Sequence, residues 1–130
     1  MNNKKEMLLS YIKSNVAPIL TDITSLSDIN NAIILPANVD KIELNGHYSG
    51  TEFLPPLWLN EIINSKESKI LVINKIDTIS KDEQLKFGEL LEYRKISTFD
   101  LPKSCVIIVT TNEINPEKIN EEIFSLVAVI

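Results

Sequence analysis

The sequence predicts an α/β protein: a three-layer α/β/α sandwich in which helices cover both faces of a five-stranded, mostly parallel sheet. Continuous apolar runs of strand length, such as residues 69–74 and 104–110, are typical of strands buried on both faces of such a sheet. Segments with helical spacing of apolar residues alternate with these runs, and parallel neighbours need such crossovers. We expect a single domain over residues 1–130.

In the first half of the chain, the apolar pattern changes from segment to segment. Residues 5–16 place Met7, Leu8 and Ile12 on one side of a helix. Residues 41–45 alternate apolar and charged side chains, as a strand does. The expected elements are a helix over 5–16, a strand over 17–20, a polar loop over 21–28, a helix over 29–35 ended by Pro36, and a strand over 41–45.

The second half continues the alternation after a surface connection, residues 46–56, that contains two glycines and two prolines. Ser80 stands three residues before Glu83, a spacing that predicts the start of a capped helix. Pro116 predicts the first turn of another helix. The expected elements are helices over 57–64, 80–93 and 116–123 and strands over 69–74, 104–110 and 126–130.

The composition argues against two kinds of site. Three glycines in 130 residues lie well below the usual share of roughly 7%, which disfavours a glycine-rich phosphate loop. The net charge is −5 and Arg94 is the only arginine, whereas nucleic-acid surfaces gather Lys and Arg on one face. We therefore expect no direct nucleic-acid partner.

The single cysteine, Cys105, lies inside an apolar run, so we expect a buried structural thiol in a reducing compartment rather than a disulfide or a nucleophile. The apolar runs are shorter than the roughly 18 residues of a membrane span. The N-terminal segment lacks the pattern of a signal peptide. These observations predict a cytoplasmic protein with no membrane segment.

Polar segments follow three of the predicted strands, at residues 21–28, 74–77 and 110–113. In an open parallel sheet, ligands collect outside the carboxyl ends of the strands. We expect these three polar strand ends to face one crevice.

Residues 69–124, from KILVINKID to INEEIF, resemble the second half of an AAA+ ATPase. In that family the Walker B strand leads through a helix and a short hairpin to a strand ending in the sensor asparagine, the position that Asn112 holds here. LPKSCVIIVTTNE and the helix ending LLEYRKI are similar to the MoxR-like and clamp-loader-like branches. The resemblance implies a P-loop NTPase-like fold with strand order 5-1-4-3-2. Because the chain stops after the fifth strand, we expect no helical lid.

The phosphate loop of that family is replaced in this chain. A working loop needs G-x-x-x-x-G-K-[ST], in which glycines bring backbone N–H groups to the phosphates, Lys binds their charge and a hydroxyl binds Mg²⁺. Thr21 and Leu26 hold the glycine positions, Ser27 the lysine position and Asp28 the hydroxyl position.

The Walker B acids, which hold Mg²⁺ and polarise the attacking water, are replaced by Asn74 and Lys75, although Asp77 follows two positions later. An amide is a weak Mg²⁺ ligand, and a cationic lysine is no base at neutral pH. The segment before the last strand also lacks an arginine finger. We predict that the protein is not an enzyme, with no catalytic residue, no cofactor and no metal.

A competing motif overlaps the same positions. Asn74, Lys75, Ile76 and Asp77 spell N-K-x-D, the guanine-reading signature of GTPases, at the end of an apolar strand as in that family. A GTPase also needs a D-x-x-G switch, and none of the three glycines has an aspartate three residues earlier. A guanine-nucleotide-binding switch without hydrolysis nevertheless remains an alternative function.

Two further groups are open to more than one interpretation. His47, the only histidine, has neither a cysteine nor a second histidine nearby, so we expect a surface residue rather than a metal ligand. Phe53, Leu54 and Trp58, beside the prolines 55–56, are either core residues or part of an exposed apolar contact surface.

The predicted function is therefore that of a catalytically inactive AAA+-like domain that acts as a protein-interaction or assembly subunit. The resemblance implies an AAA+ protein or a second copy of the chain as partner, and a clamp-loader-like setting in DNA replication or repair. A third hypothesis is an adaptor or inhibitor that docks on an AAA+ partner.

Overall fold

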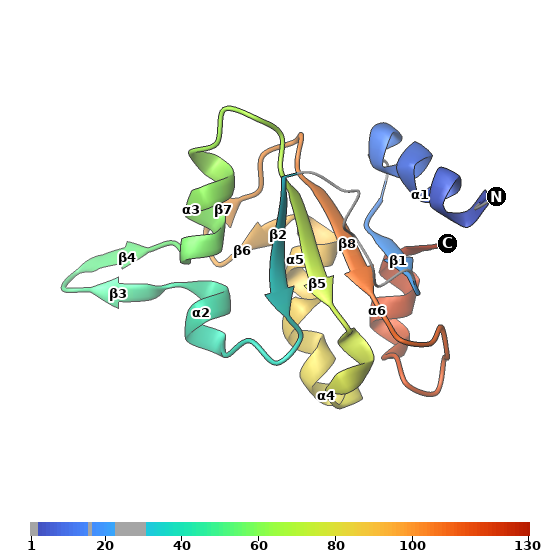
Figure 1. Ribbon diagram of the computed structural model, residues 1–130. Coiled ribbons are helices and arrows are strands. Elements are labelled where there is room, and N and C mark those ends of the chain that lie inside the picture. Colours follow the sequence, from blue (N-terminus) through green and yellow to red (C-terminus); the bar gives the residue numbers. More distant parts are fainter. Residues whose placement is uncertain (1–2, 16, 23–30) are drawn as a thin grey trace.

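The computed structural model describes residues 3–15, 17–22 and 31–130 of the chain. Its centre is a five-stranded sheet in which all strands run parallel, in the order β2-β5-β8-β1-β9 (Figure 1). The predicted α/β class with a five-stranded parallel sheet is confirmed. The strands are β1 (Ile19–Thr21), β2 (Ala32–Pro36), β5 (Ile70–Asn74), β8 (Val106–Thr110) and β9 (Ala128–Val129).

Helices, two antiparallel hairpins and two 3₁₀ turns complete the described part of the chain. Figure 1 shows the hairpin β3-β4 extending away from the sheet. The helices are α1 (Asn3–Ser14), α2 (Lys41–Asn45), α3 (Leu57–Ile63), α4 (Lys81–Gln84), α5 (Gly88–Tyr93) and α6 (Glu121–Leu126). The hairpins are β3 (His47–Ser49) with β4 (Glu52–Leu54) and β6 (Lys95–Ile96) with β7 (Phe99–Asp100), and the 3₁₀ turns are η1 (Ile76–Thr78) and η2 (Leu85–Phe87).

Side chains of the central strands are buried alternately on the two faces of the sheet. On one face, Leu71 and Ile107 join a large apolar core with side chains of α3, α5 and α6. On the other face, Val72 and Ile108 pack with Leu8 of α1. Helices therefore cover both faces, as the continuous apolar runs predict.

The segment 29–35, predicted as a helix, contains a strand instead: β2 pairs with β5 in parallel along its whole length, from Ala32 opposite Ile70 to Pro36 opposite Asn74. Residues 29–30 lie outside the described part of the chain. The prediction is wrong because a short apolar run suits a strand and a buried helix equally well. Pro36, assigned as a helix breaker, sits at the end of an edge strand, where proline is tolerated.

The strand predicted over 41–45 is also wrong, because these residues form α2. Asp40 caps this helix: its carboxylate accepts a hydrogen bond of 2.7 Å from the Glu43 N–H. Leu44 is buried, but Ile42 is 66% exposed, so the apparent alternation does not reflect one buried strand face. The cap decides the conformation of so short a segment.

The helix predicted over 80–93 is interrupted by η2. Ser80 caps α4 as expected, since its hydroxyl accepts from the Glu83 N–H at 3.2 Å. The 3₁₀ turn then changes the helical period, so Phe87 is buried and Leu85 is exposed.

The helix predicted over 116–123 begins only at Glu121. Asn120 caps it by accepting a hydrogen bond of 2.9 Å from the Glu122 N–H, whereas Pro116 lies in the preceding turn. Asparagine is a stronger helix start than proline because its side chain satisfies a free N–H group.

Gln84 is a buried polar side chain that joins the loop after β5 to the loop before α6. Its Nε2 donates to the carbonyl oxygens of Ile76 (3.2 Å), Ile79 (3.3 Å) and Lys118 (2.8 Å). Its Oε1 accepts from the Asn120 N–H at 2.7 Å. Both segments lie next to the carboxyl ends of the strands, so this amide fixes the frame of the candidate site.

We expect Gly46→Ala to lower the free energy of unfolding by about 2–4 kcal/mol. Gly46 has φ +94°, and an added Cβ would lie 2.3 Å from the carbonyl oxygen of Leu54 at the base of the β3-β4 hairpin. Gly88→Ala is the matched control, because Gly88 has helical φ and nothing lies within 4 Å of an added Cβ. That control is expected to gain up to about 1 kcal/mol. Equal effects of the two changes in urea unfolding would contradict the assigned backbone of Gly46.

Candidate functional site

The carboxyl ends of β1, β5 and β8 lie side by side, as the sequence predicts. Thr21 at the end of β1 is opposite Thr110 at the end of β8. β8 also pairs with β5, which ends at Asn74. The polar residues that follow β5 and β8 are therefore brought to one edge of the sheet, which is the position where open parallel sheets bind ligands.

The hydroxyl of Thr110 joins the ends of β8 and β5. Its Oγ1 accepts a hydrogen bond of 2.8 Å from the Lys75 N–H and donates one of 3.0 Å to Oδ1 of Asn74. Thr110 is fully buried and Asn74 is partly buried. The side-chain carbonyl oxygen of Asn74, the residue predicted to stand at the first Walker B position, therefore has a partner within the protein.

Asp77 and Asn112 form a second contact between the same two strand ends. Oδ1 of Asp77 accepts from the main-chain N–H of Asn112 at 3.2 Å and from its side-chain Nδ2 at 3.3 Å. Asn112, predicted from the AAA+ resemblance to be the sensor residue, therefore donates to a carboxylate of its own chain. The side chains of Asn74 and Asp77 thus both bond within the protein, whereas the side chain of Lys75, which lies between them in sequence, is exposed.

Lys75 has φ +56° and ψ +60°, so the backbone turns sharply directly after β5. Its carbonyl oxygen accepts from the Thr78 N–H at 3.0 Å, which closes the 3₁₀ turn, and also from the Thr78 hydroxyl at 2.7 Å. The side chain of Lys75 is exposed, while Ile76 is fully buried. The N-K-x-D segment therefore presents one cation to solvent and holds its aspartate against the next strand.

The predicted phosphate-loop positions are described only at Thr21. Its side chain is buried, and its carbonyl oxygen accepts from the Thr111 N–H at 3.0 Å. Leu26, Ser27 and Asp28 lie outside the described residues.

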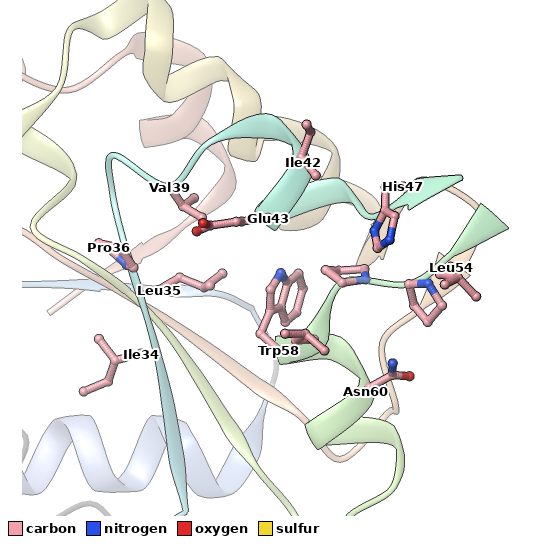
Figure 2. Close-up of a pocket in the computed structure, with 13 residues that line it drawn as sticks. Ile34, Leu35, Pro36, Val39, Ile42, Glu43, His47, Leu54, Trp58 and Asn60 are labelled. Carbon is pink, nitrogen blue, oxygen red and sulfur yellow. The ribbon is translucent and has the colours of Figure 1, made fainter. Parts of the chain in front are cut away.

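A groove of about 550 Å³ lies beside the edge strand β2, well within the size range of ligand sites in proteins. We call it the β2 groove. Figure 2 shows Leu35 pointing toward Trp58 across it and Ile34 on the other side of the strand. Its lining comes from β2 (Ile34, Leu35), α2 (Ile42, Glu43), residues 54–56 and α3 (Leu57, Trp58).

The sequence left open whether Trp58 and its neighbours belong to the core or to an exposed apolar surface, and the structure shows both. The indole of Trp58 is 6% exposed, and its Nε1 donates to the carbonyl oxygen of Leu44 at 3.2 Å, so it is a core residue. Leu54 and the prolines 55–56 line the β2 groove. Leu57, the first residue of α3, is 83% exposed at the groove. Two neighbouring prolines before a helix were the sequence signal for this surface.

Neither His47 nor any other group in the described ranges gathers the ligands of a metal site: no three His, Cys, Asp or Glu side chains lie close enough together to hold an ion. His47 is exposed and lines the β2 groove. In the same ranges, no helix has both the length and the apolar character required to cross a bilayer.

Cys105 is fully buried just before β8. Burial raises the pKa of its thiol, and the nearby Arg94 guanidinium opposes this rise to a smaller extent. Nη2 of Arg94 donates to the carbonyl oxygens of Pro102 (2.9 Å) and Cys105 (2.6 Å). The only arginine of the chain thus stabilises the backbone of residues 102–105. Because its pKa is raised, the Cys105 thiol is protonated at neutral pH.

A scan against protein-family models finds no match to this chain, and a search of the curated proteins finds none either. The resemblance to AAA+ ATPases stays a prediction, based on the order of the elements and on the residues quoted above.

We expect Thr110→Val to lower the free energy of unfolding by about 1–3 kcal/mol, because valine keeps the shape but leaves the Lys75 N–H and the Asn74 carbonyl without their partner. Thr78→Val is the control, since that hydroxyl is exposed and water can replace it. The control is expected to change stability by less than about 0.5 kcal/mol. Denaturant unfolding that ranks the two variants equally would show that the Thr110 contacts contribute nothing.

We expect the Cys105 thiol to react with Ellman's reagent far more slowly in the folded protein than in guanidinium chloride. Because burial raises the folded-state pKa, the unfolded chain loses the thiol proton first. The stability of the native protein therefore falls relative to that of Cys105→Ala as the pH rises above the ordinary thiol pKa. Parallel pH dependences of the two proteins would contradict a raised pKa.

Proposed function

We propose that this chain is a P-loop NTPase-like domain of the AAA+ type that binds proteins and does not hydrolyse nucleotide. The strand order supports the proposed fold: numbered along the chain, the five strands of the central sheet lie in the order 5-1-4-3-2. The second strand of this series is β2, not the segment 41–45 expected from the sequence. The hairpin β6-β7 before β8 is consistent with the same family pattern.

The observation that carries the proposal is the hydrogen bonding at the carboxyl edge of the sheet. Asn74 receives a hydrogen bond from Thr110, and Asp77 receives two from Asn112. In an ATPase the groups equivalent to Asn74 and Asn112 bind Mg²⁺, water or the γ-phosphate. Here they hold two strand ends together, so a nucleotide would have to replace internal contacts to reach them.

The residue types at this edge argue in the same direction. In-line attack on a γ-phosphate requires a carboxylate that polarises water, and Lys75 occupies that position. The side chain of Lys75 is exposed, and an ammonium group has no lone pair with which to accept a proton. Residues 74–75 therefore offer neither a general base nor the acidic pair that holds Mg²⁺. The two nearby carboxylates have partners within the chain: Asp77 bonds to Asn112, and Glu113 pairs with Lys118.

Protein binding fits the rest of the surface better than small-molecule chemistry. Two large aliphatic side chains at the β2 groove, Ile42 and Leu57, are 66% and 83% exposed, and Ile34 on the other side of β2 is 58% exposed (Figure 2). Such clusters of exposed apolar side chains are typical of interaction sites. An AAA+ protein or a second copy of the chain, in a clamp-loader-like assembly, is the partner class that the family resemblance favours.

Isothermal titration of the full chain with ATP, ADP, GTP and GDP in the presence of Mg²⁺ tests the proposal. We expect no dissociation constant below about 1 mM, which corresponds to roughly −4 kcal/mol. An intact P-loop ATPase in the same buffer serves as the positive control. Micromolar binding of ATP would overturn the proposal. Micromolar binding of GDP that is lost in Asp77→Ala would instead establish the guanine-reading interpretation of residues 74–77.

A further inference from the structure

The strand β2 forms an open edge of the sheet. β5 is its only strand neighbour among the described residues. The carbonyl oxygen of Asn31 accepts from the Ile70 N–H at 3.0 Å, and the Ala37 N–H donates to the carbonyl oxygen of Asn74 at 3.2 Å. In a parallel ladder, alternate residues of a strand bond to the same neighbour. The backbone N–H and carbonyl groups of the odd-numbered residues between 31 and 37 therefore point toward β5.

The even-numbered residues direct their backbone groups to the open edge. Ala32 and Ile34 each present an N–H and a carbonyl oxygen there, whereas Pro36 has no N–H and its carbonyl oxygen accepts from the Val39 N–H at 3.0 Å. An edge of this kind is a template for a further strand. Pro36 removes a donor at one end of β2, so added pairing is strongest around Ile34.

The β2 groove offers side-chain contacts next to this edge. An added strand would place alternate side chains on opposite faces of the sheet. One set would reach the groove between Leu35 and Trp58, and the other would meet Ile34, which Figure 2 shows on the far side of β2. This is the arrangement of β-strand addition, in which backbone pairing gives affinity and side-chain pockets give specificity.

The charge of the surroundings indicates which strand fits. The segment 31–63, which forms the groove walls, holds four acidic residues and one lysine, and Lys86 adds a second cation because its Nζ donates to the carbonyl oxygen of Val39 at 2.7 Å. The surroundings of the groove therefore stay acidic. Glu43 lines the groove and, among the described residues, its carboxylate makes neither a hydrogen bond nor an ion pair. A cation beside this carboxylate in a largely apolar groove would be favoured, and a second acidic strand would be repelled.

We propose that β2 and its groove bind an extended segment of a partner protein in which aliphatic residues alternate and one Lys or Arg lies opposite Glu43. This inference rests on the proposed protein-binding function and names its surface and the chemistry of its partner. A second copy of β2 is a poorer match, because β2 carries no cation to meet Glu43.

The test uses a display library of random twelve-residue peptides selected on the full chain, followed by affinity measurements with the selected peptides. We expect enrichment of alternating aliphatic residues with Lys or Arg. Glu43→Lys should weaken binding of these peptides about threefold to tenfold, and Glu92→Lys, which makes the same charge change on α5, should leave it within twofold. Enrichment of acidic peptides, or of none, would overturn the proposal.

A second variant separates backbone pairing from packing. Ile34→Pro removes the outward N–H without touching the ladder to β5, and should weaken binding about tenfold, whereas Ile34→Val keeps the N–H and should lose less than threefold. Amide hydrogen exchange on the unmodified chain gives the same answer without a variant. Peptide should slow exchange at Ala32 and Ile34, and unchanged exchange there would contradict strand addition.

The outcomes distinguish this inference from the proposed function. Selected peptides that map to residues 74–77 and 110–113, and resist both Glu43→Lys and Ile34→Pro, would overturn the β2 site and leave a protein-binding function intact. A concentration-dependent dimer in sedimentation that is lost in Ile34→Pro would replace the partner segment with a second copy. Micromolar nucleotide binding, in contrast, bears on the proposed function alone.

Discussion

The burial of β8 on both faces is the constraint on which the rest of the structure depends. All five of its residues are buried, so its backbone groups must find their partners in neighbouring strands and its side chains must be covered by helices on both sides. Polar chemistry is therefore confined to the strand ends. Thr110, the last residue of β8, is the point where the apolar interior meets the polar edge, and its hydroxyl holds the end of β5 in place.

The two edges of interest differ in how far their polar groups are already satisfied. At the carboxyl edge, the side chains form two pairs, Thr110 with Asn74 and Asn112 with Asp77. The position where open parallel sheets bind ligands therefore holds hydrogen bonds between the ends of two strands. At the β2 edge, backbone donors and acceptors face outward beside exposed aliphatic side chains. A surface with unused hydrogen-bonding groups and unburied apolar area gains more from a partner than one whose groups are paired.

The sequence predicted long, uniform segments well and short ones poorly. The runs that became β5 and β8 have one plausible conformation, because aliphatic stretches with polar ends fit a buried parallel strand. The segments 29–35 and 41–45 were assigned the wrong way round, since five to seven residues carry too little periodicity to separate helix from strand. The cap at Asp40 and the pairing with β5 decided them. Candidate residues Asn74, Lys75, Asp77 and Asn112 were placed at the correct edge, but their mutual contacts were not foreseen.

By itself the sequence determined the parallel α/β sheet and the polar residues at its strand ends, because burial and hydrogen bonding at β5 and β8 depend on residue types that can be read directly. It also determined that residues 74–75 are an asparagine and a lysine rather than two acids. Only the tertiary structure decided that Asp77 meets Asn112, that Leu57 stays exposed and that β2 is an edge. The physical reason is that each of these depends on a contact between segments distant in sequence, and local patterns do not encode which neighbour a strand or side chain finally meets.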